Sequence, residues 1–525
     1  MNHPKLVESM LNPEFYPHKP DSVELIQTHI SFIFIAGDMV YKVKKAVDFG
    51  FLDFTTLGKR KYYCDEELRL NRRLARDVYR AVVRIIEDND GNLHLRNGDN
   101  IVEYAVEMKK IPENRMLYNL LAEKKVDATV MDTIARKVFE FHKSADTGGE
   151  IDRIGGIETI RHNHDENFEQ TADYINITIS DKQYRFIKSY ANEFLDRNKD
   201  LFETRVRDHK IRDCHGDLHL QHICLSDDIL IFDCIEFNER FRYLDVAAEV
   251  AFLSMDLDFN GYPEYADAFI KSYINYSSDE EIQTLLNFYK CYFAYVRGKV
   301  IGFKINDSAV TVDERQAATA TAARYFNLAY TYAARLEKPT LIITAGLMGT
   351  GKSVVAGNIA SLLGIEVIRT DVVRKAILGI PQTERHHEDF GGGIYSHETT
   401  RKTYATALEE AYTILNNGKS VIVDASFKDR EERKQAWDVA SHCDADFFVV
   451  ECVCPEDILK ERLDNRMNDT QEVSDGRWEI FQAQKNTFDT INEIPARSHI
   501  VVDTSQSIEM STHYVIDRIK AGIGL

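Results

Sequence analysis

The segment GLMGTGKS, at 346–353, constrains the fold of this chain more than any other stretch. The apolar, β-branched run TLIITA that precedes it predicts a buried parallel strand. The run that follows, 354–363, is rich in Val, Ile, Leu and Ala and predicts a helix packed on that strand. Glycines between a strand and a helix let backbone N–H groups surround an anion. This context predicts a phosphate-binding loop in a nucleoside-triphosphate site, and it disfavours the alternative of a Gly-rich turn that fits by chance.

The residue types in this loop suit different tasks. Lys352 would reach the terminal phosphates, and the Ser353 hydroxyl would ligate magnesium. We therefore expect ATP and Mg²⁺ as cofactors. The residues expected to contact the nucleotide here are Gly346, Gly349, Thr350, Gly351, Lys352 and Ser353.

Length and charge limit the remaining possibilities. A chain of 525 residues exceeds one ordinary core, so more than one domain is expected. A net charge of −20 disfavours broad binding to nucleic acid or anionic membranes, although a basic pocket for a nucleic-acid end stays open. The chain has no apolar run of roughly 20 residues and its start lacks the apolar core of a secretory signal. We expect a cytoplasmic protein whose cysteines, including Cys452 and Cys454, are reduced thiols and not metal ligands.

The pattern of elements changes near Lys338-Pro339, which predicts domains at 1–336 and 337–525. Beyond this point five apolar strands alternate with helices, so an α/β domain with a five-stranded parallel sheet is expected. Before it, a hairpin at 28–48, a helix at 60–75 and a second strand pair precede a mostly helical stretch. That order predicts an α+β domain with two lobes. The expected parallel strands begin at Thr340, Ile365, Ser420, Asp446 and His499.

Two aspartates in the first domain suit phosphoryl transfer. Asp217 follows His-Gly in a predicted tight loop, and a hairpin over 223–232 would return Asp233 beside that loop. One carboxylate could accept a hydroxyl proton while the other holds the magnesium that bridges the phosphates. By itself, however, an Asp in a turn is more often structural.

These residues resemble the aminoglycoside phosphotransferase-like kinases, whose fold is protein-kinase-like and bilobal, over most of 20–300. HGDLHLQH is similar to the catalytic loop of that family, and IFDCIEF to its metal-binding strand end. VYKVKK would be the strand that carries the ATP lysine, Lys42, with Lys44 on the same face as its rival. Glu67 could turn inward to pair with that lysine, and Glu66 is the alternative. The alternative interpretation of Lys42 is a solvated strand lysine.

The resemblance extends to two later residues, and the sequence differs from the family pattern at one position. Arg242 and Asp245 match the segment after the metal strand, where Asp245 is expected to cap a helix. His222 stands where the family has a metal-binding Asn. Magnesium prefers oxygen ligands, so this domain either binds metal differently, works slowly or has lost catalysis.

The second domain supplies residues for kinase chemistry. Asp371 and Arg374 begin a helix directly after the second predicted strand. A carboxylate there could deprotonate an acceptor hydroxyl, and the arginine could hold a phosphate. The alternative is that Asp371 merely caps the helix and Arg374 lies on the surface. Asp424, at the end of SVIVD, is expected to act as a direct or indirect magnesium carboxylate.

Two more groups follow in this domain. Arg462 and Arg466 share one helix face and could close over the phosphates as a lid, although a solvated face explains the spacing equally well. His386, His387, Glu388 and Asp389 have no standard metal-ligand spacing, so a metal site is not expected there.

GLMGTGKS, TDVVRK, VIVDASF and the arginine pair resemble small P-loop kinases related to polynucleotide kinase, gluconate kinase and zeta toxins, over 340–505. In order and content, the chain resembles bacterial fusions of an aminoglycoside phosphotransferase-like domain with such a kinase. The resemblance implies a bifunctional ATP-dependent phosphotransferase, with Asp371 as base and a small hydroxyl compound as acceptor. An ATP-binding regulatory protein without productive transfer is the alternative, and the acceptor and oligomeric state stay open.

Overall fold

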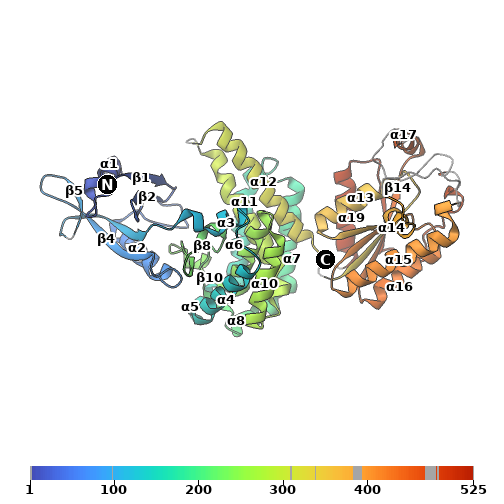
Figure 1. The fold of residues 1–525 in the computed structure, drawn as a ribbon, viewed down its shortest axis with the longest axis horizontal. Coiled ribbons are helices and arrows are strands. Elements are labelled where there is room, and N and C mark those ends of the chain that lie inside the picture. The colour runs from blue at the N-terminus through green and yellow to red at the C-terminus, as the bar shows by residue number, and fades with distance from the viewer. Residues whose placement is uncertain are drawn as a thin grey trace. The chain divides into compact units, whose positions relative to one another are not determined.

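The computed structural model of the chain describes residues 3–96, 98–307, 310–336, 338–381, 393–466, 481 and 484–523. The chain divides into two compact units, Met1–Ala333 and Ala334–Leu525 (Figure 1). The division lies close to the boundary expected from the sequence. None of the helices in the described ranges combines the length and the hydropathy that a bilayer crossing requires.

The N-terminal unit begins with a six-stranded antiparallel sheet in the order β1-β2-β3-β6-β4-β5. Its strands are β1 Val23–Gln27, β2 Ser31–Ala36, β3 Met39–Lys44, β4 Tyr79–Glu87, β5 Leu93–Leu95 and β6 Ile101–Lys109. The turn between β2 and β3 contains Gly37 at a φ of 63°, a conformation that glycine adopts without steric cost. Helix α2, Leu57–Asn71, packs on β4 and β6, and α1, His3–Leu11, contacts β1. The expected hairpin and the helix after it are confirmed.

The rest of this unit is mainly helical, as the sequence predicts. Two short antiparallel ladders interrupt the helices: β7 Ile211–Asp213 pairs with β10 Tyr243–Asp245, and β8 Ile223–Leu225 pairs with β9 Ile229–Ile231. The buried helix α9, Val246–Phe259, packs against α10 and α11. The other helices are α3 Leu117–Ala122, α4 Thr129–Ser144, α5 Glu150–Ile154, α6 Ile157–Thr171, α7 Asp181–Arg197, α8 Lys199–Arg207, α10 Pro263–Ser277, α11 Ile282–Gly302 and α12 Val312–Ala334.

The C-terminal unit is an α/β domain around a five-stranded parallel sheet in the order β12-β13-β11-β14-β15. Its strands are β11 Thr340–Ala345, β12 Glu366–Arg369, β13 Val421–Asp424, β14 Asp446–Val453 and β15 His499–Asp503. Its helices are α13 Lys352–Leu363, α14 Thr370–Ile377, α15 His397–Asn416, α16 Arg430–His442, α17 Glu456–Arg466 and α19 Ile508–Gly522. Helices α15 and α16 cover one face of the sheet, and α13 packs with α19 on the other (Figure 1). All five predicted strands are confirmed.

A buried group of ion pairs joins helix α8 to the start of α9 and to the segment between α10 and α11. The Arg205 side chain is fully buried and contacts both oxygens of Asp245, at 2.9 and 2.7 Å, and both oxygens of Asp279, at 2.6 and 2.8 Å. Asp245 also accepts the N–H of Ala247 and so caps α9, as expected.

We expect Arg205→Ala to destabilise the N-terminal unit by about 3–5 kcal/mol, because the buried Asp245 and Asp279 lose the cation that they share and only Asp279 keeps a second one, Lys210 at 3.1 Å. Hydrogen exchange of peptides from 1–333 during urea titration measures this loss. Arg207→Ala is the matched control, since Arg207 is exposed on the same helix and should change stability by less than about 0.5 kcal/mol. Equal losses of stability in the two variants would show that the ion pairs of Arg205 do not stabilise this unit.

Candidate functional site

Lysines on strand β3 meet a buried glutamate from helix α2. The Lys42 Nζ lies 2.8 Å from Glu67 Oε1 and 2.8 Å from Asp233 Oδ1. The Lys44 Nζ lies 2.7 Å from Glu67 Oε2 and also contacts Glu236. Both lysines therefore reach Glu67. Of the two, only Lys42 also reaches Asp233, which follows the β8–β9 hairpin. The interpretation of Lys42 as a solvated strand residue is wrong.

The alternative partner, Glu66, is excluded by its contacts. Its carboxylate pairs with Arg69 at 2.7 Å on the outer side of α2. Glu67, one residue later, is fully buried.

Opposite charges control the ionisation of this group. Burial by itself would raise the pKa of Glu67, but Lys42 and Lys44 outweigh it and hold that pKa below its usual range. Burial likewise opposes charge on Lys42, while Asp233 and Glu67 hold its pKa well above the usual value. Burial raises the pKa of the Glu236 carboxyl despite the attraction of Lys44. The network therefore keeps Lys42 cationic.

The hairpin β8–β9 returns the chain to the Asp217 loop, as the sequence predicts. His222 lies between the two aspartates: its Nδ1 is 3.5 Å from Asp217 Oδ2, and its Nε2 is 3.6 Å from Asp233 Oδ2. Burial and His219 lower the pKa of His222 to about 4, so its ring is neutral at pH 7. The Asp217 and Asp233 side chains are 31% and 44% exposed, and so both are open to a ligand.

The backbone of Asp233 is held in an unusual conformation. Its φ is 62°, in the left-handed region, which Asp tolerates better than bulkier residues. Its N–H donates to the Tyr79 hydroxyl at 3.2 Å, and the N–H of Cys234 donates to Asn71 Oδ1 at 2.9 Å. Contacts from the sheet lobe and from α2 thus fix the carboxylate that Lys42 meets.

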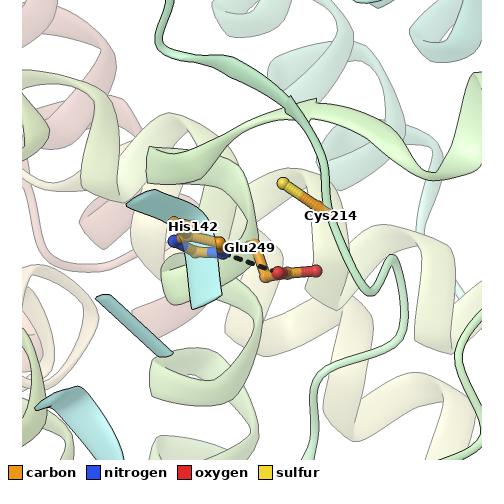
Figure 2. A group of neighbouring side chains, drawn as sticks. All are labelled: His142, Cys214 and Glu249. Carbon is orange, nitrogen blue, oxygen red and sulfur yellow. Dashed lines mark hydrogen bonds and ion pairs between the residues drawn. The ribbon is translucent and has the colours of Figure 1, made fainter. Parts of the chain in front are cut away.

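A buried carboxylate that the sequence analysis missed holds the loop that contains Asp217. Glu249 Oε1, from α9, accepts the N–H groups of His215 and Gly216, both at 2.7 Å. Its Oε2 lies 2.7 Å from His142 Nε2, and His142 Nδ1 lies 2.7 Å from the Tyr273 hydroxyl. Figure 2 shows His142 and Glu249 in direct contact, with Cys214 beside them. A single glutamate inside the apolar run VAAEVAFL was the sequence signal for a buried partner.

Arg242, which the family resemblance singles out, also supports this loop. Its Nε donates to Asp213 Oδ1 at 2.6 Å, directly before the loop begins.

In the C-terminal unit, the phosphate-binding loop joins β11 to α13. Gly346, Gly349 and Gly351 have φ values of 131°, 79° and 83°. A Cβ on Gly346 would lie 2.5 Å from the Cys452 carbonyl oxygen, so a side chain cannot be accommodated there. Lys352 begins α13, and its Nζ donates to the Leu347 carbonyl at 2.8 Å, folded over the loop. This geometry fits a phosphate cradle at a helix N-terminus.

Asp424 and Asp371, the residues predicted to hold magnesium and to act as base, lie at or just after strand ends on the carboxyl edge of the same sheet. Asp424 ends β13 and is buried, and its Oδ1 accepts from the Thr344 hydroxyl at 3.0 Å. The Thr370 hydroxyl donates to the Asp424 carbonyl at 3.1 Å, which attaches the first turn of α14 to β13. Asp371 follows in that turn and is half-buried. Asp371 therefore shares this edge with Asp424 and the loop.

Arg374 is buried, so its interpretation as a surface residue is wrong. Its Nη1 donates to the Ile394 carbonyl at 3.2 Å and to the Thr400 hydroxyl at 3.1 Å, and its guanidinium lies over the Tyr395 ring at 5.0 Å. These contacts tie α14 to the start of α15.

Arg462 lies beside the phosphate-binding loop. Its Nη1 donates to the Thr504 hydroxyl at 3.1 Å and lies 3.5 Å from the position of a Cβ on Gly351. Thr504 in turn donates to the Thr350 carbonyl at 2.7 Å. Arg466 ends α17, but its side chain lies outside the described residues, as do His386, His387, Glu388 and Asp389. Cys452 is buried and Cys454 half-buried, and both are free thiols.

Comparison with known proteins gives two results for the sequence. Residues 341–491 match the family model of an AAA domain. The chain is 28% identical over 475 residues to uncharacterized proteins of Mycobacterium tuberculosis and Mycobacterium bovis, and the match covers 90% of this chain and 92% of each relative.

Solved structures are more distant. A gluconokinase from Sinorhizobium meliloti is 20% identical with a TM-score of 0.26, covering 35% of this chain and 94% of that one. A choline/ethanolamine kinase family protein from Mesorhizobium loti is 12% identical with a TM-score of 0.37, covering 62% of this chain and 99% of that one. The loop geometry, the parallel sheet and the AAA match together identify the C-terminal unit as a P-loop nucleotide-binding domain.

We expect Glu249→Ala to loosen the Asp217 loop, because two buried N–H groups lose their acceptor at about 1–3 kcal/mol each. Hydrogen exchange at His215 to Asp217 should accelerate. Glu264→Ala removes an exposed carboxylate from α10 and should leave that exchange unchanged. An unchanged loop in Glu249→Ala would show that the contact does not hold it.

Proposed function

We propose that this chain is an ATP-dependent phosphotransferase that moves the γ-phosphoryl group of ATP to a hydroxyl of a small-molecule acceptor. The observation that carries the proposal is the attachment of α14 to Asp424 at the sheet edge occupied by the phosphate-binding loop. It brings a half-buried carboxylate, Asp371, to the edge where the terminal phosphate would lie.

In the proposed step, the acceptor oxygen forms a bond to the γ-phosphorus as the bond to the β,γ-bridging oxygen breaks. The hydroxyl proton passes to the Asp371 carboxylate, and ADP leaves with the electron pair of the broken bond. Lys352 and the loop N–H groups would hold the phosphate oxygens. Arg462 would add positive charge beside Gly351.

The residues at this edge also fit magnesium. The Ser353 hydroxyl at the start of α13 and the Asp424 carboxylate, oriented by Thr344, are oxygen donors of the kind that Mg²⁺ prefers. Bound Mg²⁺ would neutralise charge on the β- and γ-phosphates.

The N-terminal unit is proposed as a second kinase-like ATP site. Lys42 forms ion pairs with Glu67 and with Asp233. When a nucleotide binds, phosphate oxygens would replace the Asp233 carboxylate as a partner of Lys42. Asp217, in the loop held by Glu249, would accept the proton of a second acceptor hydroxyl.

A regulatory ATP-binding protein is the second candidate, and one observation favours it. His222 lies between Asp217 and Asp233, where an oxygen ligand is expected. In that case the N-terminal unit would bind nucleotide without transferring phosphate.

The test measures ATP turnover of the full chain against a library of hydroxyl compounds. An acceptor should stimulate turnover in the wild type. Asp371→Asn should lower kcat by about 10²–10⁴-fold, because the general base is lost. Lys352→Ala should weaken ATP binding at the loop as well as turnover.

Asp438→Asn is the matched control, since Asp438 is an exposed carboxylate on α16 of the same unit. Tight ATP binding without any acceptor dependence would support the regulator instead. Acceptor-stimulated turnover that survives Asp371→Asn but disappears in Asp217→Asn would move the reaction to the N-terminal unit.

A further inference from the structure

The tautomers of three histidines around Asp217 can be assigned from their neighbours. His215 Nδ1 accepts the N–H of Asp217 at 3.3 Å, and its Nε2 lies 2.9 Å from the Phe232 carbonyl oxygen, to which it must donate. His219 Nδ1 accepts the N–H of Gln221 at 3.3 Å. In a neutral imidazole one nitrogen carries the hydrogen, so both rings carry it on Nε2.

His222 has the reverse arrangement. Its Nδ1 lies 2.9 Å from the carbonyl oxygen of Asp217, which can only accept, so Nδ1 carries the hydrogen. The lone pair is then on Nε2, which lies 3.6 Å from Asp233 Oδ2. Two electron-pair donors thus face each other, an arrangement that a cation between them would stabilise.

The surrounding contacts hold both donors in place. The His222 ring packs against His219, with ring centroids 3.9 Å apart, and against Phe232, with centroids 5.7 Å apart. Lys42 takes Oδ1 of Asp233 and leaves Oδ2 toward the histidine. The His222 side chain is 14% exposed and that of Asp233 is 44% exposed, so the pair is accessible to an ion from solvent.

This donor set does not fit magnesium well, since Mg²⁺ favours oxygen ligands in a strict octahedron. Imidazole nitrogen with carboxylate oxygen suits a more nitrogen-tolerant divalent ion. We propose that His222 Nε2 and Asp233 Oδ2 are adjacent ligands of one divalent cation, and that the nitrogen makes this site prefer Mn²⁺ over Mg²⁺. The inference deepens the proposed N-terminal nucleotide site and rests on it.

The test uses the full chain carrying Lys352→Ala and Ser353→Ala, which weakens metal and phosphate binding at the C-terminal loop. Mn²⁺ is added with a non-hydrolysable ATP analogue, and electron-spin-echo modulation is recorded. We expect ¹⁴N coupling from a coordinated imidazole. Adding His222→Asn should abolish that coupling and lower by about tenfold or more the Mg²⁺ concentration that displaces Mn²⁺.

His219→Asn is the matched control: it removes the neighbouring ring, whose Nε2 carries a hydrogen, and should leave the ¹⁴N coupling intact. Bound Mn²⁺ without ¹⁴N coupling in the parent chain would overturn the inference while leaving nucleotide binding intact. Coupling that persists in His222→Asn would also overturn it. Failure of the parent chain to bind Mn²⁺ and nucleotide at all would refute the N-terminal nucleotide site together with this inference.

Discussion

The N-terminal unit depends on a group of mostly buried charges that stabilise one another around Glu67. Lys42 and Lys44 leave the sheet, Glu67 comes from α2, and Asp233 and Glu236 follow the β8–β9 hairpin. Desolvating the charge of Lys44, Glu67 or Glu236 alone would cost several kcal/mol, whereas each now contacts an opposite charge. The two lobes must therefore meet at one relative position, and that position sets Asp233 beside His222 and the Asp217 loop.

In the C-terminal unit, the phosphate-binding loop is shaped mainly by its backbone. The glycines at 346, 349 and 351 permit a loop in which amide groups can face an anion, and helix α13 begins where that loop ends. Hydroxyl groups do the positioning: Thr344 and Thr370 both contact Asp424, and Thr504 links Arg462 to the loop.

The sequence predicts the parallel sheet well because its three inner strands, β11, β13 and β14, are nearly continuous apolar runs, as strands buried on both faces are. It does not reveal β6, where Glu103 and Glu107 interrupt the apolar pattern. Glu103 is nevertheless buried, because Arg60 Nε contacts its two oxygens at 3.0 and 2.9 Å. A partner 43 residues away in the chain makes that strand possible, and no local pattern contains it.

For the candidate sites too, local sequence patterns do not contain the contacts between distant segments. Asp217, Asp233 and the loop residues 346–353 stand in recognisable local strings, and the structure brings the two aspartates to the same histidine. The hydrogen bonds from the Asp217 loop to Glu249 and from Arg462 to Thr504 join segments that are distant in the sequence. These contacts could be found only from the folded structure. The orientation of His222, which decides which of its nitrogens faces Asp233, also depends on a backbone carbonyl that sequence cannot place.

The central claim is that one chain carries two separate nucleotide sites. The most direct measurement is the stoichiometry of a non-hydrolysable ATP analogue by isothermal titration calorimetry, on the full chain and on variants of each unit. The account predicts two analogues bound per chain, one in Lys352→Ala at concentrations that saturate the N-terminal site, and one in Lys42→Ala. A single analogue bound by the wild type and lost entirely in Lys352→Ala would contradict it.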